Sequence, residues 1–223
     1  MTDRLRRIHV LVEGQTEEIV VDNVLEPYLA AQGWAVTTSL VTTKRPASGP
    51  AHKGGVTKWA KLELDIKLLL QDSSLDALTT LFDYYAFPPD SPGMATRPVG
   101  TPYERVRHVE DALHTAVANR RFFPHLVLHE LETWVFAAAD QLGSFRAEPD
   151  LARQLKSDNA AAGGPELVND DPSTAPSKRL AAYCRGYTKT FDGPLAIAEL
   201  GIDQLRAQCP HFDQWLSKLD DTR

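Results

Sequence analysis

Short apolar runs alternate with longer stretches of helical spacing through the first 140 residues. We expect strands at 8–12, 34–41, 78–83 and 122–129, and helices at 16–31, 59–70, 103–119 and 131–139. This order predicts an α/β fold with a mostly parallel central sheet and helices on both faces. Because the carboxyl ends of parallel strands lie along the same edge, residues that follow the strands are expected to meet there.

The last third of the chain carries a weaker pattern. Residues 160–173 are rich in Gly, Pro, Asn and Asp, which predicts a long loop or a local lid, and 176–183 and 201–219 have the spacing of closing helices. We therefore divide the chain into an α/β core over 1–140 and a loop and helical C-terminal extension over 141–223. A length of 223 residues suits a single structural domain in which the extension packs on the core.

Acidic side chains stand at the ends of three predicted strands. Glu13 follows the first strand with Glu17 four positions later, Asp83 ends the third strand, and Glu130 and Glu132 follow the fourth. Taken singly, Glu17 also suits a helix N-terminus and Asp83 a turn, whereas Glu13 lies between a buried strand and a glycine and needs a partner. Together the carboxylates predict a site for Mg²⁺ or Mn²⁺, which prefer oxygen ligands. Either Glu130 or Glu132 could be the ligand.

Two further polar side chains accompany the carboxylates. His129 directly precedes Glu130 and is either a hydrogen-bond partner of the site or a structural histidine. Lys178 lies in the predicted helix at 176–183, where a cation could neutralise charge on a phosphoryl transition state. The alternative is that Lys178 and Arg179 form a solvated surface pair.

Composition and motifs narrow the classes of function. The net charge of −6 argues against a general nucleic-acid coating but allows a local basic groove. The candidate phosphate-contacting residues are Lys44, Lys53, Lys58, Arg105 and Arg179. Cys184 and Cys209 lack the spacing of a zinc ribbon, and no P-loop, nucleophile elbow or dinucleotide fingerprint is present. The apolar runs are too short to span a bilayer, so we expect a cytoplasmic protein without a membrane partner.

Five segments of the chain match a known family in combination. They are Val-Glu-Gly-Gln-Thr-Glu at 12–17, Asp-Tyr-Tyr-Ala-Phe-Pro at 83–88, His-Glu-Leu-Glu at 129–132, Ala-Pro-Ser-Lys-Arg at 175–179 and Cys-Pro-His-Phe-Asp-Gln-Trp at 209–215. Together they resemble the domain of unknown function family 4276. That family is similar to the Toprim fold, the catalytic domain of topoisomerases, primases and the overcoming-lysogenization-defect nucleases. Its members are commonly found beside ATPases in bacterial defence gene clusters.

The resemblance implies roles for the matched acidic residues. Glu13 looks like the Toprim glutamate, and Glu17 looks like the additional acidic ligand of the nuclease branch. Asp83 looks like the first aspartate of the Toprim Asp-x-Asp pair. The chain departs from that pattern at Tyr85, where the second aspartate is missing. The departure puts two-metal catalysis in doubt.

The remaining matched residues could compensate for this departure. Glu130 or Glu132 would replace the missing ligand, and Lys178 is similar in placement to the late catalytic lysine of the same nucleases. A site with one metal ion and Lys178 is then a variant of the nuclease centre.

These expectations form one hypothesis and two alternatives. The hypothesis is a Mg²⁺-dependent or Mn²⁺-dependent Toprim-like nuclease that hydrolyses phosphodiester bonds in DNA or RNA. It would be the effector of a bacterial anti-phage defence system, with an AAA-type or ABC-type ATPase as partner and with self-association left open. The first alternative is a non-catalytic Toprim-like binding or regulatory subunit of an ATPase complex. The second is phosphoryl transfer on a small molecule.

Overall fold

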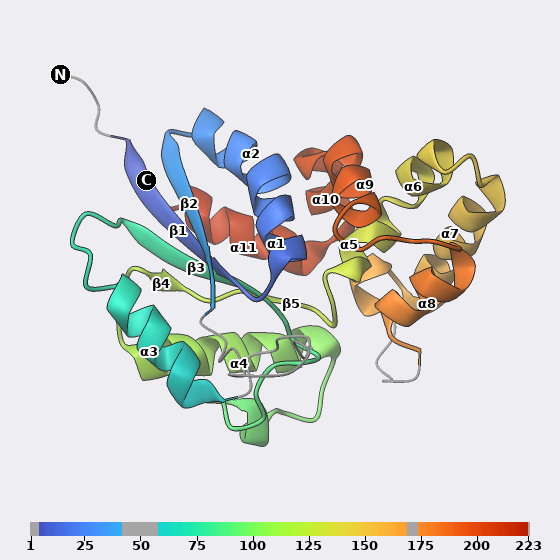
Figure 1. Cartoon of the computed structure of the whole chain (residues 1–223). Helices are drawn as coiled ribbons and strands as arrows, with labels where there is room; N and C mark the ends of the chain where they lie inside the picture. Colours follow the sequence, from blue (N-terminus) through green and yellow to red (C-terminus); the bar gives the residue numbers. More distant parts are fainter. Residues whose placement is uncertain (1–4, 42–57, 169–173, 223) are drawn as a thin grey trace, which may run out of the picture.

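A parallel sheet forms the centre of the molecule in the computed structural model, which describes residues 5–41, 58–168 and 174–222 (Figure 1). Its strands are β1 (Arg6–Val12), β2 (Trp34–Leu40), β3 (Ala77–Asp83), β4 (Phe122–Phe123) and β5 (Leu126–Val127). The strand order is β2-β1-β3-β4, β5 also pairs with β3, and every pair is parallel. The predicted α/β fold with a mostly parallel sheet is confirmed.

Helices cover both faces of this sheet, as predicted. On one face, α3 (Trp59–Leu69) and α4 (Pro102–Val117) pack against Leu11 and Leu78. On the other face, Ile8 and Val10 join a core that includes side chains of α11 (Pro210–Asp220). The opposite directions of Val10 and Leu11 follow from the two-residue period of a strand.

The helix predicted at 16–31 is interrupted by a wider turn. Its parts are α1 (Gln15–Val20), the π-helical segment η1 (Val21–Leu25) and α2 (Glu26–Ala31). Pro27 lies in the first turn of α2 and has no backbone N–H to donate, which is the physical reason for an irregular hydrogen-bond pattern just before it. The whole segment packs beside β2 and leads the chain from β1 to the neighbouring strand.

The strand predicted at 122–129 is broken into β4 and β5. Pro124 lies in the break and cannot donate to a strand partner. The side chain of Thr80 takes over the pairing, because its Oγ1 accepts from the backbone N–H of His125 and donates to the carbonyl of His125, both at 2.9 Å. The break therefore leaves His125 at a fixed position beside β3.

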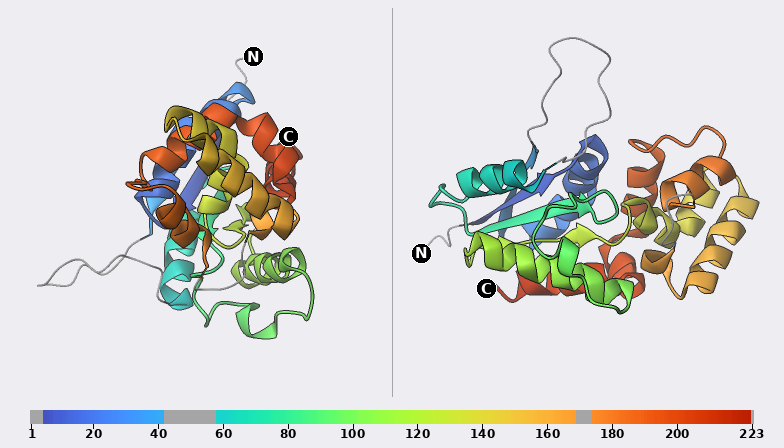
Figure 2. Two further views of the ribbon diagram at one scale, coloured as in Figure 1. Left: turned by 90° about the vertical axis from the view of Figure 1, so that its right-hand side faces the viewer. Right: turned by 90° about the horizontal axis from the view of Figure 1, so that it is seen from below.

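The C-terminal part forms a helical lobe beside the carboxyl edge of the sheet, and α11 returns along the sheet (Figures 1 and 2). The lobe contains α5 (Glu132–Ala137), α6 (Ala139–Phe145), α7 (Pro149–Ala162), α8 (Pro176–Tyr183), α9 (Asp192–Leu200) and α10 (Ile202–Gln208). One hydrophobic cluster runs from Val10 of the sheet to Leu142 and Ile197 of the lobe. None of the helices within the described ranges has the length and apolar character needed to cross a membrane.

The sequence prediction for this lobe is partly wrong. The loop expected at 160–173 begins as the end of α7 and continues into the 3-10 helix η3 (Pro165–Leu167), where Glu166 and Val168 are buried. The single helix expected at 201–219 divides into α10 and α11 at Cys209, because Pro210 begins a new helix. The segments α6, α7 and α9 were not predicted, whereas α8 has the predicted bounds.

Candidate functional site

Glu13 and Asp83 leave neighbouring strands at the same edge of the sheet. β1 and β3 pair in parallel register, with Val12 opposite Leu81. The backbone N–H of Asp83 donates a hydrogen bond to the Glu13 carboxylate. The pairing of two central strands thus fixes the first two predicted metal ligands beside each other.

Glu17 reaches the same edge from the first turn of α1. The backbone N–H groups of Glu17 itself and of Gly14 donate to its carboxylate. A methyl group in place of the Gly14 hydrogen would lie 3.1 Å from Glu17 Oε2, so a side chain at this position would press on the carboxylate. The glycine after β1 therefore gives Glu17 the space to turn toward the strand ends.

A left-handed turn after β5 brings the third acidic segment to this edge. His129 has a φ of +67°, a conformation that non-glycine residues rarely adopt. The carbonyl of His129 accepts from the backbone N–H of Tyr85, and the backbone N–H of Leu131 donates to Asp83 Oδ1 at 2.8 Å. These hydrogen bonds tie the β5–α5 junction to the end of β3 and hold the strained residue in place.

Glu130 and Glu132 both connect this junction to the helical lobe. Glu130 Oε2 accepts from the backbone N–H of Ser177 in the first turn of α8, at 2.9 Å. Glu132 is 4% exposed, and its Oε1 lies 2.6 Å from Nζ of Lys189. The two glutamates therefore have different partners but reach the same edge. We call Glu13, Glu17, Asp83, Glu130 and Glu132 the acidic cluster.

The electrostatics of the acidic cluster favour a bound cation. Burial, followed by the charge of Glu17, raises the pKa of Glu13 to about 7. Burial and then the charges of the other four carboxylates hold the pKa of Asp83 well above its usual value. Burial also raises the pKa of Glu17 and that of Glu132. Burial and neighbouring negative charge thus favour the protonated forms of Glu13, Glu17, Asp83 and Glu132, and a divalent ion would supply the positive charge that their ionised forms need.

Lys189 is the cation that the sequence prediction missed. It lies between α8 and α9 in a segment without periodicity, so only the fold reveals its position beside Glu132. Burial alone would lower its pKa, but the charges of Glu132, Glu130 and Asp83 raise it above the usual value. The ammonium group is therefore held in its charged form next to the acidic cluster.

The predicted basic residues have different surroundings. Lys178 is exposed on α8, and its catalytic role stays a prediction. Arg179 forms an ion pair with Asp158 at 2.8 Å, so contact with a phosphate would compete with that pair. Lys58 is exposed at the start of α3, whereas Arg105 Nε donates to the carbonyl of Gly100. Lys44 and Lys53 lie outside the described residues.

The donor set of the acidic cluster fits Mg²⁺ or Mn²⁺. All five side chains offer carboxylate oxygens, the ligands that these hard ions prefer. Within the described ranges, three candidate ligand atoms lie within 4.8 Å of one another only at Glu110, His125 and His211. No three ligand atoms of the acidic cluster meet this criterion, so the carboxylates would move closer together on binding an ion.

Comparison with known proteins gives a family but no described activity. No curated protein matches the chain. Among solved structures, the C-terminal region of the Burkholderia pseudomallei OLD protein matches with 14% identity and a TM-score of 0.42, over 98% of this chain and 99% of that chain. This structural likeness is too distant to assign a function. A family model described as a domain of unknown function, DUF4276, matches residues 12–220, so the chain belongs to the DUF4276 family.

Proposed function

We propose that the chain is a Toprim-like nuclease that uses Mg²⁺ or Mn²⁺ at the acidic cluster to hydrolyse phosphodiester bonds in DNA or RNA. The observation that carries this proposal is the convergence of carboxylates from three segments at the carboxyl edge of a parallel sheet. In open α/β sheets this edge is where ligands bind. The raised pKa values of Glu13 and Asp83 support the proposal further, because they indicate negative charge that the surroundings do not fully neutralise.

Each part of the cluster has a separate task in this proposal. When bound, the divalent ion would supply charge stabilisation at the scissile phosphate and increase the acidity of a bound water. Glu13 and Asp83 hold the ion on the two central strands, and Glu17 contributes from α1. Glu132 takes the place of the aspartate that Tyr85 replaces, since it is buried beside Asp83 and raises the pKa of that residue.

Lys189 is the candidate for stabilising the negative charge of the transition state. Its Nζ already lies beside the acidic cluster, and the surrounding carboxylates keep it charged. A phosphate drawn to the cluster would meet this ammonium group, which can donate to a phosphoryl oxygen as charge develops there. Lys178 lies near Ser177, the backbone partner of Glu130, and is the alternative for this role.

Substrate and partners follow from the family resemblance together with the surface charges. Lys58 and Arg105 begin neighbouring helices on one face of the sheet and are proposed to contact the nucleic-acid backbone. We propose an AAA-type or ABC-type ATPase as the partner and anti-phage defence as the setting. The proposed partner and the proposed setting both rest on the genes that commonly neighbour those of similar proteins.

A second function is favoured by the ion pair between Lys189 and Glu132. This pair neutralises part of the acidic cluster without a metal ion. A regulatory subunit that docks on an ATPase through this edge would need no further cation. Titration with Mn²⁺ separates the two functions, because only the nuclease requires a site that binds the ion.

Cleavage of plasmid DNA and of total tRNA, with Mg²⁺ or Mn²⁺, tests the proposal. The protein is assayed alone and with a candidate ATPase, as the wild type, as Glu13→Gln and as Glu18→Gln. Glu18 is the matched control, because it lies in the same helical turn as Glu17 but outside the acidic cluster. We expect cleavage by the wild type and by Glu18→Gln, and loss of cleavage in Glu13→Gln. Equal cleavage by all three proteins would contradict the assignment.

A further inference from the structure

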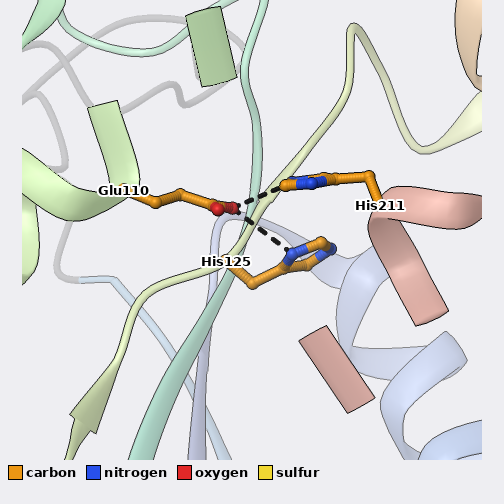
Figure 3. A group of neighbouring side chains, drawn as sticks. All are labelled: Glu110, His125 and His211. Atoms are coloured by element: carbon orange, nitrogen blue, oxygen red, sulfur yellow. Dashed lines mark hydrogen bonds and ion pairs between the residues drawn. The ribbon is translucent and has the colours of Figure 1, made fainter. Parts of the chain in front are cut away.

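A second group of candidate metal ligands lies on the buried side of α4. It is enclosed by α4, the β4–β5 break and α11. Glu110 comes from α4, His125 from the break and His211 from the first turn of α11, and all three point toward one another (Figure 3). Their side chains are 3%, 1% and 2% exposed, respectively. The nuclease proposal uses none of them.

We propose that Glu110, His125 and His211 form a buried structural site for Zn²⁺ that fastens α11 to the α/β core. Two imidazole nitrogens and one carboxylate oxygen are a donor set that Zn²⁺ accepts, whereas Mg²⁺ prefers oxygen ligands alone. This site would be independent of the acidic cluster in both position and metal preference.

The distances between the ligand atoms suit a small tetrahedral ion. Glu110 Oε1 lies 3.0 Å from His211 Nε2 and 3.4 Å from His125 Nδ1, and all three ligand atoms lie within 4.8 Å of one another. Bonds of about 2.0–2.1 Å in a tetrahedral site place ligand atoms about 3.3 Å apart. The two distances to Glu110 are therefore already close to those of a bound ion, and a water molecule would occupy the fourth position.

Unsatisfied ring nitrogens are the second observation that points to a ligand. The buried ring of His125 has no well-formed hydrogen bond among the described residues: Nδ1 reaches Glu110 Oε1 only at 3.4 Å, and Nε2 has no partner. Buried polar atoms are nearly always paired, so an orphaned imidazole calls for an explanation.

The ligands are held in position by surrounding contacts. Glu110 Oε1 accepts from the backbone N–H of Leu126 at 2.9 Å, which orients the carboxylate. The ring of His125 stacks on Trp215 with 4.3 Å between centroids and 5° between planes. Glu166 accepts from the backbone N–H groups of both His211 and Phe212 and so fixes the start of α11. A site with such fixed ligands loses little conformational freedom when it binds an ion.

The placement of the ligands indicates a structural role. Glu110 and His211 are 101 positions apart in the chain, and their contact joins α4 to the last helix. A metal ion held by three distant segments stabilises the folded state, since the unfolded chain offers no assembled site. The same ion would hold Trp215 and Phe212 in the core beside His125.

Metal content and spectroscopy test this proposal on the full chain. The protein is stripped with a chelator and then given one molar equivalent of Co²⁺, which absorbs visible light strongly in four-coordinate sites and weakly in six-coordinate carboxylate sites. We expect strong absorption that Zn²⁺ abolishes. The double variant Glu13→Gln with Asp83→Asn is the matched control and should keep the absorption, because its changes lie in the acidic cluster.

Substitution of the histidines completes the test. His211→Gln and His125→Gln should lose the cobalt absorption, and Zn²⁺ at 100-fold excess over its Kd should raise the Tm of the wild type by about 5–10 °C and that of the variants not at all. If a histidine variant does not fold, the number of Zn²⁺ ions bound per chain is measured in the Glu13→Gln, Asp83→Asn double variant instead. One tightly bound Zn²⁺ per chain in that protein supports the site, and none overturns it. Absence of strong cobalt absorption in the wild type would also overturn it.

Discussion

Two carboxylates in this molecule have opposite electrostatic surroundings. Asp83 is half-buried at the end of β3 among four other carboxylates, and desolvation and their charges hold its pKa well above the usual value. Glu110 is buried, yet despite that burial the charge of His211 and the contacts with both histidine rings hold its pKa well below the usual value. Burial alone therefore does not decide the charge of a carboxylate. The neighbouring side chains do.

The acidic cluster is short of positive charge, whereas the surroundings of Glu110 provide it through His211. At the acidic cluster, Lys189 contacts Glu132, and the raised pKa values of Glu13 and Asp83 show that negative charge is left for protons or a hard divalent ion to neutralise. Around Glu110, burial alone would lower the pKa of His211, but the charge of Glu110 and the hydrogen bond to it raise that pKa above the usual value. An ion such as Zn²⁺ would supply the positive charge that this carboxylate favours. This contrast agrees with the proposed catalytic role of the first region and the proposed structural role of the second.

Removal of Glu110 should have the largest effect on stability. Glu110→Ala leaves the ring of His211 and the backbone N–H of Leu126 buried without their partner, and breaking a buried pair in this way costs about 3–5 kcal/mol of the free energy of unfolding. Denaturant unfolding of the wild type, of Glu110→Ala and of the exposed neighbour Asp111→Ala measures this cost. A Glu110→Ala protein as stable as Asp111→Ala would show that the pair contributes nothing.

The contributions of Glu13 and Glu110 to the free energy of unfolding should depend on pH in opposite directions. The folded protein raises the pKa of Glu13 from 4.5 to about 7, so its stabilising contribution is complete below pH 4.5 and is lost as the pH rises through 7. That shift corresponds to at most about 3 kcal/mol. Glu110, with a lowered pKa, instead stabilises above pH 4.5 and loses its contribution in acid.

Unfolding curves from pH 4.5 to 8 check this contrast. The free energy of unfolding of metal-free wild type should fall relative to that of Glu13→Gln as the pH rises, and added Mg²⁺ should reduce the fall. If the wild type and Glu13→Gln change in parallel over this range, Glu13 does not have the raised pKa that the comparison requires.

Lys189 and Lys178 are predicted to differ as catalytic groups. Lys189→Ala should reduce cleavage about 100-fold, since its ammonium group stands at the site where phosphoryl charge would develop. It should also bind Mn²⁺ more tightly than the wild type, because the cluster has lost its positive neighbour. Lys178→Ala should reduce cleavage less than about 10-fold. If Lys178→Ala lost more cleavage activity than Lys189→Ala, Lys178 would be the residue that stabilises the transition state.

Gly14→Ala should have the smallest effect of these substitutions. The new methyl group would lie 3.1 Å from Glu17 Oε2 and displace that carboxylate, whereas the backbone φ of −151° suits alanine. We expect about 10-fold weaker Mn²⁺ binding, the low end of the effects seen when the surroundings of a ligand change. Mn²⁺ affinity is measured by calorimetry, with an unchanged Tm as the control for folding. Unaltered affinity would mean that Glu17 does not contact the ion.

The sequence predicts the sheet and its acidic edge well because both depend on local patterns. Apolar runs followed by helical spacing predict parallel strands, and Glu13 and Asp83 directly follow such runs. The position of Glu132 is also local, since it begins the helix after β5. The parallel arrangement of the strands is then enough to bring these residues to the same edge of the sheet.

The remaining parts depend on contacts between distant segments. Lys189 lies in a stretch without periodicity, and its role follows only from the packing of the lobe against the strand ends. The Cys-Pro-His-Phe motif was recognised, but nothing local links His211 to Glu110. The break at His125 depends on the side chain of Thr80 in another strand. In each case the energetic reason lies in a partner at least 45 positions away.

Calorimetric titration of Mn²⁺ into metal-free protein tests most directly the claim that the acidic cluster is a hard-ion site. The wild type, Asp83→Asn and His211→Gln are compared at the same pH. We predict that Mn²⁺ binding is lost in Asp83→Asn and retained in His211→Gln, because only the first substitution alters the acidic cluster. Equal Mn²⁺ binding by Asp83→Asn and the wild type would contradict the account.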